Sequence, residues 1–414
     1  MTDPDTHRAI DAVWRIESPK LIAGLTRIVR DVGLAEDLAQ DALVAALEQW
    51  PESGVPAKPG AWLMATAKHR AIDRLRRDER LERKNQEIGR EMEVQESQQD
   101  GDDLLRLIFI SCHPMLAPEA RVALTLRLLA SLTTEEIARA FLLPVSTIAQ
   151  RIVRAKRTLT EARVPFEVPF GPELDARLSS VLQVIYLVFN EGYSATAGDD
   201  LIRAGLCEDA LRLGRILAGL APKEPEVHGL VALMEIQASR TRARVGPSGE
   251  MVLLLDQDRG RWDQLLIRRG LAALERAEQL GGALGPYALQ AAIAACHARA
   301  RTAAETDWAR IVALYDALAE LTPSAVVELN RAVAVGMAFG PAAGLELVDA
   351  LTAEPSLETY HFLPSVRGDL LAKLGRHDEA RSEFERAASL TQNARERELL
   401  LGRAAASSHE GTAS

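Results

Sequence analysis

The stretch Leu132–Leu159, LTTEEIARAFLLPVSTIAQRIVRAKRTL, decides how this part of the chain folds. Thr133 and Glu136 have the T-x-x-E spacing of a capping box, in which each side chain binds the other residue's backbone N–H. This pattern predicts a short helix over 135–141. Pro144 lies in the tight turn that follows, and a second helix is predicted to begin near Ser146. A short helix, a tight turn and a second helix form a helix-turn-helix.

The second helix has an apolar back and a basic front. Its apolar positions recur at helical spacing and predict a buried stripe: Ile148, Ile152, Ala155 and Leu159. In a helix-turn-helix this helix lies in the major groove, where its first residues contact base edges and its cations contact phosphates. The residues expected at base edges are Ser146, Thr147, Ala149, Gln150 and Arg151, and those expected at phosphates are Arg154, Lys156 and Arg157. The same helix pair also occurs as plain scaffold.

The charge is unevenly distributed along the 414 residues, although 49 basic and 59 acidic side chains give a net charge of −10 overall. Residues 1–163 hold 24 basic and 25 acidic residues, whereas residues 164–414 hold 25 and 34. Within the first part, residues 85–103 carry seven acids and one arginine and have little apolar content. We therefore expect a flexible acidic linker at 85–103, with basic helices on both sides of it.

The residues before this linker also read as helices. Residues 5–50 predict two of them, with a break at Val32-Gly33, and the Pro- and Gly-rich segment Glu52–Gly60 reads as a loop. A long helix is predicted from Ala61 through Arg77. Its arginines at helical spacing are Arg70, Arg74 and Arg77, and its expected buried side holds Trp62, Ile72 and Leu75.

After residue 163 the chain reads as successive amphipathic helices separated by Gly and Pro. Ala380, Phe384 and Ala387 are spaced as in the second helix of a tetratricopeptide (TPR) repeat, and a plain helical bundle is the alternative. The fold class expected is all-α: two small helical domains, the second with the helix-turn-helix, followed by a helical-repeat superhelix. The domain ranges expected are 1–84, a linker at 85–103, 104–163, a TPR-like domain at 174–401, and a disordered tail at 402–414.

Two motifs in order resemble a known family. LAEDLAQDALVAALEQW with AWLMATAKHRAIDRLRR resembles region 2 of extracytoplasmic-function (ECF) sigma factors, and the helix-turn-helix resembles their region 4. The C-terminal helices resemble the TPR-like extension of one subgroup of this family. The resemblance implies core RNA polymerase and promoter DNA as partners, with the −35 element bound by the helix-turn-helix. It implies that Asp37, Gln40 and Asp41 contact polymerase, and that Lys68, Arg70, Arg74, Arg76 and Arg77 contact the −10 element.

The same resemblance places the loop Glu52–Gly60 where family members capture an extruded base of the −10 element. One residue departs from the family pattern, because His69 stands where many relatives carry asparagine. The resemblance also implies that the acidic C-terminal domain modulates activity, through an intramolecular contact or a protein partner. Within that domain, FNEGY (Phe189–Tyr193) and DQDRGRWD (Asp256–Asp263) are polar-aromatic clusters where a functional contact is expected, with turn and cap chemistry as the alternative.

Other classes of protein find less support in the sequence. It has no GxxxxGK[ST] and no HExxH motif, so we expect no enzyme, no cofactor and no metal site. Cys112, Cys207 and Cys296 stand far apart and predict free core thiols. With no signal peptide and no long apolar run, a soluble cytoplasmic protein without membrane contact is expected. The rival interpretation is a helix-turn-helix transcriptional regulator with a ligand- or protein-binding TPR-like domain, which would leave the first helices without a role.

Overall fold

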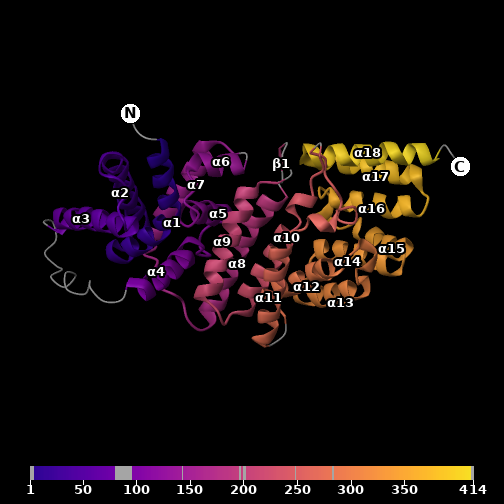
Figure 1. Ribbon diagram of the computed structural model, residues 1–414. Coiled ribbons are helices and arrows are strands. Elements are labelled where there is room, and N and C mark those ends of the chain that lie inside the picture. The colour runs from indigo at the N-terminus through magenta and orange to yellow at the C-terminus, as the bar shows by residue number, and fades with distance from the viewer. Residues whose placement is uncertain are drawn as a thin grey trace. The chain divides into compact units, whose positions relative to one another are not determined.

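The computed structural model describes residues 4–79, 96–141, 143–194, 197–198, 202–247, 249–281 and 284–411. In this part of the chain it has eighteen α-helices and one pair of two-residue strands, so the expected all-α class is confirmed (Figure 1). The chain divides into two compact units, residues 1–187 and 188–414.

The first unit contains seven complete helices and the beginning of an eighth. They are α1 (Pro4–Val29), α2 (Val32–Ser53), α3 (Pro59–Glu79), α4 (Glu96–Ser111), α5 (Pro118–Leu128), α6 (Thr134–Ala140), α7 (Val145–Glu161) and α8 (Pro172–Tyr193). The break predicted at Val32-Gly33 is wrong by two residues. Arg30 adopts the left-handed backbone conformation (φ 54°), and Asp31 caps α2 by accepting from the Leu34 backbone N–H at 2.7 Å.

Helix α3 forms as predicted but buries a different set of side chains. Leu63, Ala67 and Ala71 are buried, Trp62 is half-buried against the ring of Trp50, and Ile72 is exposed. The alanines recur every four residues and let α3 approach its neighbours closely, so size as well as hydropathy selects the buried face.

The helix-turn-helix is confirmed. The Thr133 backbone N–H donates to Glu136 Oε2 at 2.7 Å, and the Glu136 N–H donates to Thr133 Oγ1 at 3.1 Å, which completes the capping box. Helix α6 begins and ends one residue earlier than predicted, and α7 begins at Val145. All four residues of the predicted stripe on α7 are buried: Ile148, Ile152, Ala155 and Leu159.

Two boundaries of the expected domains differ from the structure. Helix α4 begins at Glu96, inside the range predicted as linker, and Asp103, the last residue of that range, is buried between Arg27 (2.9 Å) and Arg106 (2.6 Å). Residues 85–95 of that range lie outside the described part. The first half of α8 belongs to the helix-turn-helix unit: Arg177 donates to the Phe109 carbonyl at 3.1 Å, and Ser180 donates to the Cys112 carbonyl at 2.6 Å.

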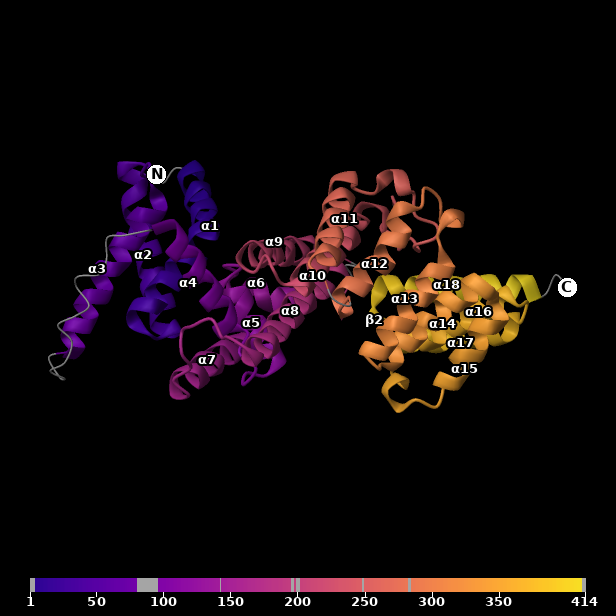
Figure 2. The same ribbon diagram turned by 90° about the horizontal axis from the view of Figure 1, so that it is seen from below.

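The second unit continues with helices that each pack on the next. They are α9 (Ala204–Leu220), α10 (Pro225–Ala238), α11 (Gln264–Gln279), α12 (Pro286–Arg299), α13 (Trp308–Leu321), α14 (Ala325–Phe339), α15 (Pro341–Leu351), α16 (Phe362–Lys373), α17 (His377–Leu390) and α18 (Ala394–Gly411). Short 3₁₀ turns lie between them: η1 (Thr241–Ala243), η2 (Arg259–Arg261), η3 (Ala303–Glu305) and η4 (Pro355–Leu357). Figure 2 shows α13–α18 next to one another.

The last helices bear on two predictions. Ala380, Phe384 and Ala387 are buried on α17 in one core cluster, which a TPR-like repeat and a plain helical bundle would both produce. The predicted disordered tail is wrong as far as Gly411, because α18 runs to that residue and buries Ala404 and Ser407. The small residues of this segment pack closely against the neighbouring helices. Their low hydropathy is the reason why the sequence predicted a disordered tail instead of a helix.

Strand β1 (Ala197–Gly198) pairs in parallel with β2 (Gln392–Asn393), so the beginning and the end of the second unit are joined. Among the residues that the structure describes, no helix combines the length and apolarity that a membrane crossing requires.

Candidate nucleic-acid and polymerase interface

Helix α7 presents half of its eight predicted DNA-contacting residues to solvent. Ser146, Gln150, Arg154 and Arg157 are exposed, whereas Thr147, Ala149, Arg151 and Lys156 are half-buried. Pro144 precedes the helix in an extended conformation, and the buried stripe fixes which side faces outward. A basic face on a helix whose first turn is accessible has the form that major-groove recognition requires.

Two cations of this face already have acidic partners. Arg157 Nε lies 2.6 Å from Glu161 Oε1, and this hydrogen bond raises the pKa of the guanidinium. The pair is exposed, so phosphate can displace it at small cost. Lys156 differs, because its ammonium binds the buried carboxylate of Glu36 on α2.

The predicted polymerase contacts lie on one side of α2. Asp37 and Asp41 are exposed, and Gln40 is half-buried and donates its amide to Glu36 Oε1 at 2.7 Å. The predicted −10 contact Arg70 reaches across from α3. Its guanidinium donates to the Asp41 carbonyl and lies 3.8 Å from the Asp41 carboxylate. The structure thus brings a predicted DNA contact and a predicted polymerase contact together.

The structure describes the side chains of only some of the other residues predicted to contact the −10 element. Lys68 is half-buried on α3, and His69 is exposed. The loop predicted at Glu52–Gly60 is shorter, because α2 runs to Ser53 and α3 begins at Pro59, and it is largely exposed. Arg74, Arg76 and Arg77 belong to α3, but their side chains lie outside the described ones.

Glu36 is the functional candidate that the sequence prediction missed. Its side chain is only 4% exposed, its Oε1 accepts from Arg127 Nε at 2.6 Å and from the Gln40 amide, and its Oε2 forms an ion pair with Lys156. An acidic residue on the buried face of an amphipathic helix signals a paired charge, and that signal was present in the sequence.

In the second unit, arginines connect the two polar-aromatic motifs. Arg240 lies 5.8 Å from the ring of Tyr193 in FNEGY and 5.8 Å from the ring of Trp262 in DQDRGRWD, and it donates to the Tyr193 hydroxyl at 2.8 Å. Arg244 stacks on Tyr193 at 3.8 Å. This network of cation–π contacts explains both motifs as parts of one packed cluster.

Arg259 extends this cluster to the following helices. It lies 5.0 Å from the Trp262 ring and donates to the carbonyls of His297 at 2.5 Å and Ala300 at 2.7 Å. Burial, aided by Arg240 and Arg259, lowers the pKa of His297 to about 4. His297 is therefore neutral at physiological pH, as the surrounding cations require.

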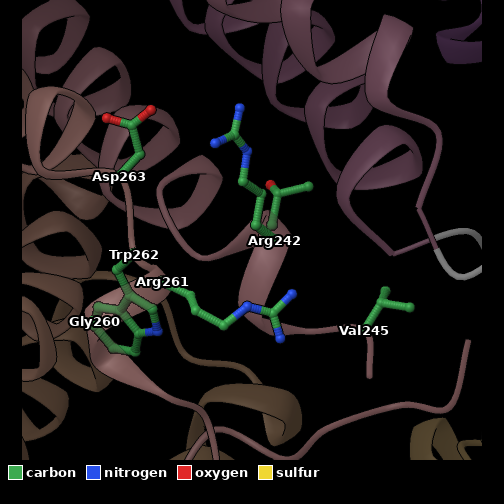
Figure 3. Close-up of a pocket in the computed structure, with 7 residues that line it drawn as sticks. Arg242, Val245, Gly260, Arg261, Trp262 and Asp263 are labelled. Carbon is green, nitrogen blue, oxygen red and sulfur yellow. The ribbon is translucent and has the colours of Figure 1, made fainter. Parts of the chain in front are cut away.

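A shallow cavity of about 670 Å³ lies beside this network (Figure 3). It is lined by Thr241, Arg242, Val245, Gly260, Arg261, Trp262 and Asp263. Arg261 extends from η2 toward Val245, while Asp263 caps α11 by accepting from the backbone N–H groups of Leu265 and Leu266. The cap chemistry expected as the alternative for DQDRGRWD is thus present.

Three family models match successive parts of the chain. Residues 14–81 match sigma-70 region 2, residues 106–159 match sigma-70 region 4, and residues 177–278 match a family of unknown function designated DUF6596. The region 2 match gives the first helices a role that an ordinary helix-turn-helix regulator would not need. The fold and these matches define the class of protein as a sigma factor.

One relative is similar over nearly the whole chain and another over part of it. An uncharacterized protein of Rhizobium meliloti (strain 1021) is 43% identical over 396 residues, which is 94% of this chain and 93% of its own length. A protein of Mycobacterium tuberculosis, from strains CDC 1551 and H37Rv, is 26% identical over 170 residues, 39% of this chain and 58% of its own length. Its name is probable ECF RNA polymerase sigma factor SigI. No solved structure matches. The chain belongs to the ECF-type sigma factors, in a form with a C-terminal helical extension.

Proposed function

We propose that this sigma factor binds core RNA polymerase through Asp37, Gln40 and Asp41, contacts the −10 element with α3, and contacts the −35 element with α7. The observation that carries the proposal is the helix-turn-helix. Its α7 buries its apolar stripe and leaves Ser146, Gln150 and Arg154 exposed on the opposite side. The exposed acids Asp37 and Asp41 support the polymerase contact, because they offer charge to a protein partner rather than to DNA.

Runoff transcription with purified core polymerase tests this function, with Arg151→Ala as the test of the division of labour. The loss of one base-edge contact is expected to weaken −35 binding by the holoenzyme about 10-fold, while affinity for core polymerase stays unchanged. Arg268→Ala, an exposed charge-matched change on α11, serves as the control. The absence of any runoff product, or equal losses of promoter and polymerase binding, would contradict the proposal.

We also propose that the acidic C-terminal extension modulates promoter output, by an intramolecular contact or with a protein partner. Its excess of acids repels DNA phosphates and can compete for the basic helices. A truncated chain that lacks the extension tests this proposal only if the first unit keeps all the residues that pack within it. A chain ending near Pro169 would lose Arg177 and Ser180, which pack against α4 and α5, so the chain should end at Leu187.

We expect the chain ending at Leu187 to bind non-specific DNA more tightly than the full chain at low salt. The difference should vanish near 1 M salt, where the Debye length is about 3 Å. Transcription from the promoter should also differ between the chain ending at Leu187 and the full chain. The measurements are DNA affinity across a salt series and transcription from a promoter selected with the full chain. Equal output and equal affinity from both chains would remove the modulatory role.

A further inference from the structure

Within the first unit, α2 of the region 2 domain meets α5 and α7 of the region 4 domain through a buried carboxylate. Glu36 binds Arg127 at the end of α5, Lys156 on α7 and Gln40 on its own helix. We call these four residues the Glu36 latch. Because Glu36 is nearly fully buried, its charge depends on these partners, and removing them leaves a carboxylate without compensation.

Further polar contacts surround the latch along the same boundary. Thr160 on α7 donates its hydroxyl to Asp31 Oδ2 at 2.8 Å, so one Asp31 oxygen caps α2 and the other holds α7. Ser18 Oγ on α1 lies 2.6 Å from Ser131 Oγ in the turn before α6. Arg15 on α1 lies 3.4 Å from Glu136 on α6. The two domains are thus joined by directional bonds along α1 and α2.

Two members of the latch have other proposed partners. Lys156 is assigned to a DNA phosphate, and its ammonium cannot reach a phosphate while it is bound to the buried Glu36. Gln40 is assigned to polymerase, yet its amide is donated to Glu36. Glu36 therefore joins one residue from each proposed interface.

We propose that the Glu36 latch holds the two DNA-binding domains closed in the free chain, and that polymerase binding to α2 opens it. Engagement of Gln40 by polymerase removes one hydrogen bond from Glu36 and brings a protein surface against the helix that α5 and α7 cover. Release of Lys156 then gives α7 its phosphate contact. In the free chain α7 therefore lacks the phosphate contact of Lys156 until the chain is part of the holoenzyme. This inference rests on the proposed function for the roles of Gln40 and Lys156.

A reversible cross-link tests whether the domains separate. The two serine oxygens lie 2.6 Å apart, so the sulfur atoms of the double variant Ser18→Cys, Ser131→Cys would be neighbours and should form a disulfide on mild oxidation. The three native cysteines are buried, and burial raises the pKa of Cys112 to about 11 and of Cys207 to about 12, which suppresses competing thiolates. We expect rapid cross-linking in the free chain and at least 10-fold slower cross-linking after saturation with core polymerase.

The latch residue itself is tested in the same background by Glu36→Gln, which keeps the shape of the side chain and removes its charge. We expect about 10-fold slower cross-linking, because Arg127 and Lys156 lose their common partner. Glu48→Gln, an exposed acid on the same helix, is the matched control and should cross-link like the parent. Equal rates for the Glu36 and Glu48 variants, or no effect of polymerase, would overturn the latch.

Transcription separates this result from the proposed function. The oxidised double variant should give no runoff product, and reduction should restore it. Full activity of the oxidised form would also overturn the latch. If the reduced form is inactive, the proposed function fails, and the comparison of cross-linking between the Glu36 and Glu48 variants still decides whether Glu36 holds the domains closed.

Discussion

Arg259→Ala should lower the free energy of unfolding of the C-terminal unit by about 3 kcal/mol, since it leaves two partly buried carbonyl groups without this donor. One Arg259 nitrogen, Nη1, donates to the carbonyls of both His297 and Ala300, and Nη2 donates to the Thr306 hydroxyl at 3.1 Å. The alanine variant also removes the cation over the Trp262 ring. These hydrogen bonds connect η2 to the end of α12 and to Thr306, which lies just before α13. Their loss is therefore expected to destabilise the packing of several elements.

The neighbouring Arg261 supplies the control. Arg261 is exposed beside the shallow cavity, and Arg261→Ala removes the same charge from the same 3₁₀ turn. We expect Arg261→Ala to change the free energy of unfolding by no more than about 0.5 kcal/mol. Urea denaturation followed by tryptophan fluorescence measures both variants, because Trp262 is buried in the affected cluster. Equal destabilisation by the two changes would show that charge, not the network of Arg259, stabilises this turn.

Local patterns made the helix-turn-helix predictable. The capping box of Thr133 and Glu136 lies within four residues, and the stripe from Ile148 to Leu159 repeats within one helix, so neither depends on distant parts of the chain. The resemblance that placed the two sigma regions rests on equally contiguous motifs, and the family matches confirm it.

Tertiary partners made other features unpredictable. Asp103 belongs by composition to an acidic linker, but Arg27, 76 residues earlier, stabilises it in a buried helix. Glu36 and Lys156 are 120 positions apart, and no local spacing relates them. In the same way FNEGY and DQDRGRWD were each singled out, but Arg240, which joins Tyr193 to Trp262, belongs to neither motif.

Close helix packing in the C-terminal unit leads to the second large effect. Helices α10 and α12 meet at Gly229, where an added Cβ would lie 2.7 Å from the Ala288 backbone nitrogen and 2.9 Å from its Cα. The helices cannot easily separate, because Glu226 accepts from the backbone N–H groups of Tyr287 at 2.8 Å and Ala288 at 3.1 Å. Gly229→Ala should therefore cost about 2–3 kcal/mol, even though alanine is the better helix former.

Gly219→Ala gives the opposite expectation in the same unit. Gly219 lies in the last turn of α9, and an added Cβ there meets no atom within 4 Å. The change should raise the free energy of unfolding by about 0.5–1 kcal/mol, since it reduces the entropy of the unfolded chain. Thermal unfolding of the two variants compares them directly. A gain at both positions would mean that α10 and α12 do not approach as closely as Gly229 allows, because only backbone contact can reverse the intrinsic preference for alanine.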